Sequence, residues 1–179
     1  MQNSSTTKSQ NFGFTLIEAI VATAVFAFAM SAILGSFLSV MRINAKTRSI
    51  RTVEENARFI TEFFTREIRN GVIDFGASGY NHTIPSQGRV GTLYLINRNG
   101  ETERFSAVSG VIQLVKAGAS TTLSGSDVII PALNFYIRPT TQGNQELVTF
   151  SFQISSNLGS NVADKSSLTI QSSVAARDY

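Results

Sequence analysis

A run of 23 residues without a charged side chain, Ala19 to Met41, constrains this chain more than any other feature of its sequence. It exceeds the ~20 apolar residues that a helix needs to cross a bilayer. A core helix of a soluble protein is rarely apolar on all sides over such a length, because its outer face meets water. The run therefore predicts a helix that resides in a membrane, with burial inside an oligomer as the alternative. One acid, Glu18, lies at its N-terminal edge.

The same helix is expected to continue far beyond the apolar run. Residues 14–70 contain no proline and a single glycine, Gly35, and an unbroken helix of this length would extend about 85 Å at ~1.5 Å per residue. Gly35 indicates either a locally unwound point or a close helix contact. Asn70 and Gly71 predict the C-terminal stop. In the second half, the apolar residues recur on one helical face, and they are Ile43, Ile50, Val53, Ala57, Ile60, Phe64 and Ile68.

Beyond the helix, the apolar residues alternate with polar ones, as in half-buried antiparallel strands. Segments 92–97 and 101–108 flank an Asn-Gly pair, which predicts a hairpin. Three later segments have apolar faces, formed by Leu133, Phe135 and Ile137, by Val148, Phe150, Phe152 and Ile154, and by Leu168, Ile170 and Val174. Segments 117–127, 140–145 and 155–165 are rich in Ser, Gly and Asn and are expected to be loops.

These patterns predict an α+β fold in which a long N-terminal helix packs on an antiparallel β-sheet. The first half of the helix is expected in the membrane, and its amphipathic second half offers the apolar stripe that one face of the sheet requires.

Charge and composition exclude several functions. Residues 42–69 carry seven basic side chains against four acids, while residues 70–179 carry seven of each sign. The excess of positive charge therefore lies directly C-terminal to the apolar run, where contact with lipid head groups explains it at least as well as contact with DNA does. Nucleic acid is not an expected partner. The chain has no cysteine, which excludes disulfides, thiolate metal sites and cysteine nucleophiles.

The stretch GFTLIEAI, residues 13–20, combines four features at fixed spacing. A short polar leader ends in Gly13, an aromatic Phe14 follows, Glu18 is the fifth residue after that glycine, and the apolar run begins directly behind. This combination closely resembles the processing and assembly motif of type IV pilins and of the pseudopilins of type II secretion. The family fold is a long N-terminal helix on an antiparallel sheet, which is similar to the fold that the pattern of the whole chain predicts.

The chain departs from the major subunits of that family. Gly35 stands where many major pilins have a proline, there is no cysteine pair to close a C-terminal loop, and the aspartates of the head are scattered. A minor subunit is therefore expected. Residues 42–71 and the ending LTIQSSVAARDY resemble, more loosely, the J-type pseudopilin and the W-type minor pilin.

The resemblance implies a chain of four parts. These are a cytoplasmic leader of residues 1–13, a transmembrane and filament-core helix of 14–41, an amphipathic helix of 42–70 and a β-rich head of 71–179. It implies a single-pass protein of the inner membrane, with its N-terminus cytoplasmic and its head extracytoplasmic, that later joins a pilus or a periplasmic pseudopilus. Basic residues alone would favour the opposite orientation, so the residues by themselves leave the topology open.

The implied partners are a prepilin peptidase that also N-methylates, other pilins or pseudopilins, the inner-membrane assembly platform and membrane lipid. The implied cut lies between Gly13 and Phe14, and Phe14 would carry the methyl group. Glu18 would then act in assembly and register, because its carboxylate can meet the new amine of a neighbouring subunit. On residue type alone, Glu18 is equally well explained as a head-group residue near a helix N-terminus.

No enzymatic activity, cofactor or metal is expected. The single histidine, His82, lies in a turn-like segment, and the chain has no GxxxxGK, HExxH or CxxC motif. The alternative function is a membrane-tethered extracytoplasmic binding domain that never polymerises.

Overall fold

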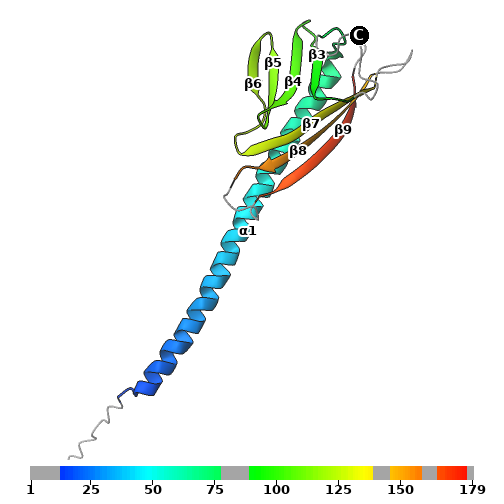
Figure 1. Cartoon of the computed structure of the whole chain (residues 1–179). Coiled ribbons are helices and arrows are strands. Elements are labelled where there is room, and N and C mark those ends of the chain that lie inside the picture. The colour runs from blue at the N-terminus through cyan, green and yellow to red at the C-terminus, as the bar shows by residue number, and fades with distance from the viewer. Residues whose placement is uncertain (1–12, 78–88, 139–145, 159–164, 177–179) are drawn as a thin grey trace, which may run out of the picture. The chain divides into compact units, whose positions relative to one another are not determined.

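The computed structural model describes residues 13–77, 89–138, 146–158 and 165–176. Their order in the chain is a helix followed by nine strands: α1 (Leu16–Asn70), β1 (Val72–Ile73), β2 (Arg89–Val90), β3 (Thr92–Ile96), β4 (Thr102–Val108), β5 (Val111–Lys116), β6 (Ala119–Thr122), β7 (Val128–Arg138), β8 (Leu147–Ser156) and β9 (Ser167–Ala175). The chain forms two compact units, residues 1–43 and 44–179, which are described separately. Figure 1 traces the elements.

In the first unit, no other described part of the chain covers α1. Every described side chain in this unit is exposed, including Phe28 at 79% and Leu38 at 55%. The helix is continuous through Gly35, and a Cβ added there would meet no atom within 4 Å. α1 is thus unbroken at Gly35, where the sequence leaves a helix break open.

The strands of the second unit form two antiparallel sheets, whereas the sequence pattern had suggested one. The order of the five-stranded sheet is β1-β3-β4-β5-β6, and that of the four-stranded sheet is β2-β7-β8-β9. Alternation shows which residues share a face but not which strands pair. The bulge between Ile129 and Ala132 in β7 lies where the two sheets meet. There the Ile130 N–H donates to the carbonyl of Gly110, in the turn between β4 and β5 of the other sheet. The α+β class itself is confirmed.

Three tight hairpins connect the five-stranded sheet. The predicted Asn-Gly hairpin joins β3 to β4, with Gly100 at a φ of 77°. Two further turns have both central residues at positive φ, Ser109 with Gly110 and Ala117 with Gly118, a geometry that matches the twist of the paired strands. The loop expected over residues 117–127 is therefore wrong at β6, whose four small or polar residues are all exposed and lack an apolar alternation.

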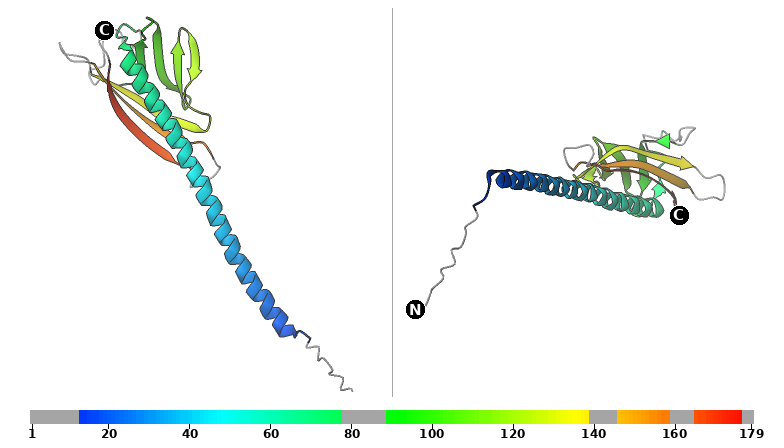
Figure 2. Two further views of the ribbon diagram at one scale, coloured as in Figure 1. Left: turned by 180° about the vertical axis from the view of Figure 1, so that it is seen from behind. Right: turned by 90° about the horizontal axis from the view of Figure 1, so that it is seen from below.

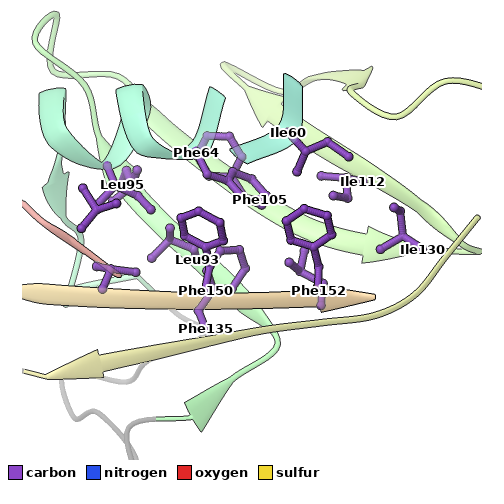
Figure 3. Packing of buried hydrophobic residues seen from close by; sticks show 14 of the residues in the cluster. Ile60, Phe64, Leu93, Leu95, Phe105, Ile112, Ile130, Phe135, Phe150 and Phe152 are labelled. Carbon is purple, nitrogen blue, oxygen red and sulfur yellow. The ribbon is translucent and has the colours of Figure 1, made fainter. Parts of the chain in front are cut away.

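The core lies between the amphipathic part of α1 and both sheets. Ile60 and Phe64 point from the helix toward Phe105, Phe150 and Phe152 on the strands (Figure 3). Both views in Figure 2 show this part of α1 as a layer beside the strands. The expected helical face is confirmed at its five C-terminal positions, Val53, Ala57, Ile60, Phe64 and Ile68, which are at most 2% exposed.

The two N-terminal positions of that expected face are wrong. Ile43 is 61% exposed and Ile50 is 37% exposed, while Ser49 is 1% exposed. Buried positions run from Ser49 in steps of four, four, three, four and four, so the buried stripe shifts around the helix and reaches Ser49 in place of its neighbour. The Ser49 hydroxyl has no hydrogen-bond partner within the described residues.

The apolar faces of β7 and β8 are confirmed, since their seven expected residues are all at most 6% exposed. The face of β9 is only partly covered. Val174 is 6% exposed and Ile170 packs against the core, but Leu168 is 39% exposed. β9 is the last strand of its sheet, so the cover over its first residues is incomplete.

Candidate functional site

The sequence motif lies at the start of α1, where Thr15 caps the helix. The backbone N–H of Glu18 donates to Thr15 Oγ1 at 3.3 Å, and the N–H of Ala19 donates to the Thr15 carbonyl at 3.2 Å. The bond to the Thr15 hydroxyl satisfies one of the donors that a helix N-terminus leaves free, and the bond to the Thr15 carbonyl is the first bond within the helix. Sequence reasoning missed Thr15, although the spacing Thr-x-x-Glu is a known signature of helix starts.

Gly13 and Phe14 precede the helix in an open stretch. A Cβ added at Gly13 would meet no atom within 4 Å, and the Phe14 side chain is 77% exposed. The fold of this chain therefore does not itself require a glycine here. Any requirement for glycine at this position must come from a molecule that acts on the chain.

Glu18 lies in the first turn of α1. Its side chain is exposed, and within the described residues it forms no ion pair. It borders a shallow groove whose other lining residues are Phe14, Ile17, Val21 and Ala22. The structure thus brings the predicted terminal residue and the predicted acid to the same side of the helix start. The positive end of the helix dipole favours a carboxylate at this position.

Other polar side chains in the apolar run bond to their own helix. Thr23 Oγ1 donates to the carbonyls of Ala19 and Ile20, and Ser31 Oγ donates to that of Ala27 at 2.8 Å. Such bonds make hydroxyls compatible with a bilayer, where water cannot satisfy them. A carboxylate has no donor to offer a backbone carbonyl, so Glu18 cannot bond to its helix in the way that these hydroxyls do.

The uncovered part of α1 has the length and composition of a membrane span. An 18-residue window reaches a mean hydropathy of 2.2, and none of it is buried. A soluble core helix of this hydropathy would be covered by its own chain. A signal sequence near an N-terminus would also meet this hydropathy criterion. The motif at residues 13–20 is therefore needed to distinguish a membrane anchor from a signal sequence.

A cluster of charged groups in the head is paired within itself. Asn97 Nδ2 donates to Glu101 and Glu103 at 2.9 Å, and Lys116 Nζ lies 3.1 Å from each of these carboxylates. The hydrogen bond from Asn97, followed by Lys116, lowers the pKa of Glu101. The cluster borders a hollow of about 270 Å³ at the C-terminal end of α1. Its carboxylates accept from Asn97 and Lys116, so the cluster links the β3–β4 hairpin to β5.

The described residues contain no group of three or more His, Asp or Glu side chains placed to hold a metal ion. His82 and residues 1–12 of the expected leader lie outside the described residues.

Comparison with known proteins identifies the same segment. Residues 8–34 match the family model of the prokaryotic N-terminal methylation motif, the prepilin signal of type IV pilins and pseudopilins. No curated protein and no solved structure matches the chain significantly. The match spans the end of the expected leader, the motif and most of the apolar run. It is typical of structural subunits without enzymatic activity, and with the apolar helix it indicates membrane anchoring.

Proposed function

We propose that this chain is a minor structural subunit of a type IV pilus or a type II secretion pseudopilus. The observation that carries the proposal is the prepilin signal at residues 8–34, which leads into a helix whose apolar surface the described residues leave uncovered. The β-rich head of residues 71–179 belongs to a separate compact unit, residues 44–179, that also contains the amphipathic part of α1. A looser similarity to the J-type pseudopilin and the W-type minor pilin supports the minor role.

The life of such a subunit begins in the inner membrane. The leader of residues 1–13 remains cytoplasmic and the head is extracytoplasmic. A prepilin peptidase cuts between Gly13 and Phe14 and methylates the new amine of Phe14. The assembly platform then moves the subunit from lipid into the filament, where other pilins or pseudopilins cover the residues that were exposed to lipid.

The cut creates the partner that Glu18 lacks. A free or methylated amine at Phe14 is positively charged, and in a bundle of apolar helices it can meet the Glu18 carboxylate of a neighbouring subunit. Either charge alone in a low-dielectric bundle is strongly unfavourable. The pair therefore favours one axial position of the incoming subunit, which gives Glu18 its role in register.

The mass of the membrane-extracted protein tests this proposal. We expect loss of residues 1–13 and a gain of one methyl group, together with co-purification of the protein with filaments. A retained leader and a monomeric membrane protein would instead support the second candidate, a tethered extracytoplasmic binding domain. The uncovered apolar helix is compatible with either function, so the cleavage decides between them.

Replacement of Glu18 by alanine should leave the protein membrane-bound and cleaved but reduce its incorporation into filaments, because the incoming amine loses its carboxylate. Quantitative immunoblots of sheared filament and membrane fractions would measure the ratio of incorporated to membrane-bound protein. The matched control is Glu54→Ala, which removes an exposed acid from the same helix within the other unit. Wild-type incorporation of the Glu18 variant would contradict the assigned role.

A further inference from the structure

The four-stranded sheet ends in an edge strand, β9, that lacks the usual protection against further pairing within the described residues. β9 has nine residues, and within the described part of the chain no strand lies on its other side. The other three edge strands, β1, β2 and β6, have two, two and four residues. Natural edges are commonly shortened, charged, bulged or interrupted by proline, because an open edge is a template for another strand. β9 has no charged residue or proline, and its pairing with β8 has no register shift.

The hydrogen bonds at both ends of β9 show which of its backbone groups face the open side. The N–H of Ala176 donates to the Glu146 carbonyl, and the N–H of Ser156 donates to the Ser166 carbonyl, each at 2.8 Å. Bonded pairs alternate along an antiparallel ladder, so the even-numbered residues of β9 bond to β8. The odd-numbered residues therefore direct their N–H and C=O groups to the open side, and they are Ser167, Thr169, Gln171, Ser173 and Ala175.

The side chains of β9 indicate what an added strand must carry. On the core face, Leu168 is 39% exposed and Ile170 is only partly buried. On the open side these even-numbered positions form non-hydrogen-bonded pairs, in which opposing side chains lie closest. Apolar residues opposite them would extend the core over Leu168. The outer face carries hydroxyl and amide groups, as in the pair of Thr149 and Ser173, whose oxygens are 2.7 Å apart.

We propose that β9 binds an extended, uncharged segment of another polypeptide that adds a fifth strand to this sheet. The segment alternates apolar residues with Thr, Ser or Gln, as β8 does on the other side. A second copy of this chain fits less well. Two β9 strands paired about a two-fold axis would orient the two α1 helices in opposite directions, whereas subunits anchored in one membrane share one direction. This choice of occupant rests on the proposed membrane anchorage.

A synthetic peptide tests the proposal. It carries VTFSFQI, the sequence of residues 148–154, between paired lysines and bears a fluorescent label. We expect saturable binding to the full chain in detergent micelles by fluorescence anisotropy, and weak binding of a peptide with the same residues in an order that lacks alternation. Gln171→Pro removes an N–H on the open side without removing a bond to β8, and proline is tolerated at such edge positions. It should weaken binding about tenfold or more.

Gln171→Val is the matched control, because it changes the side chain but keeps the N–H, and it should bind as wild type does. Hydrogen exchange gives a readout that does not depend on any variant. The amides of Thr169, Gln171 and Ser173 should exchange rapidly in the free protein and slowly with peptide, while that of Ser172 is slow in both. Equal binding by both variants, slow exchange of the odd-numbered amides without peptide, or a dimer that excludes the peptide would each overturn the proposal. None of these outcomes depends on leader cleavage, which the mass measurement tests separately.

Discussion

Leucine in place of Gly13 should leave the protein at its full length, with residues 1–13 still attached. A Cβ added at Gly13 meets no atom within 4 Å, so the substitution should not disturb the fold. A peptidase, in contrast, must close on the backbone at the cut, and a side chain there obstructs its approach. The expected effect is a nearly complete loss of mature protein, measured as the intact mass after membrane extraction.

Gly35→Leu is the matched control for this experiment. It makes the same chemical change in the same unit, and a Cβ at Gly35 also meets no atom within 4 Å. We expect this variant to be cleaved as wild type is, whatever its effect on later assembly. A mature mass for the Gly13 variant, or an equal block in both variants, would show that the cut does not depend on this glycine.

The candidate site could be predicted from the sequence because its residues are contiguous. Gly13, Phe14 and Glu18 lie within six positions of one another at the start of α1, so their proximity follows from the sequence without any tertiary contact. The long helix could be predicted as well, because a run of 57 residues without proline leaves few alternatives to a helix. The cap at Thr15 is also predictable, because its spacing from Glu18 is a signature of helix starts.

Other features depend on contacts that no local pattern contains. Ser49 is buried in place of Ile50 because the position of the sheets around α1 decides which side is covered. The small and polar residues of β6 predict a loop, because the pairing of this strand depends on backbone hydrogen bonds to β5 and not on burial. The open edge of β9 follows from the strand order, which alternation alone does not determine.

Phe64 connects the helix to both sheets through its ring. Its centroid lies 5.7 Å from that of Phe105 in the five-stranded sheet. It lies 5.5 Å from Phe135 and 5.2 Å from Phe150, both in the four-stranded sheet. The three pairs are edge-on, the arrangement that aromatic quadrupoles favour. Removal of this one ring should therefore weaken both helix–sheet contacts at once.

Phe64→Ala should lower the free energy of unfolding of the head by about 3–5 kcal/mol, the usual cost of a buried phenylalanine, and its melting temperature by roughly 10 °C. Thermal unfolding of the full chain in detergent, followed by circular dichroism, would measure the shift.

Phe59→Ala is the matched control, because it removes the same ring from the same helix. Phe59 is 50% exposed, and its ring is tilted against that of Phe63 with the centroids 6.0 Å apart. This variant should therefore lower the free energy of unfolding by about 1 kcal/mol or less. Similar shifts in the two variants would show that Phe64 does not hold the sheets together. Because Phe64 and Gly13 belong to different compact units, we expect the Phe64 variant to lose its leader as wild type does, which would separate the stability of the head from the processing of the N-terminus.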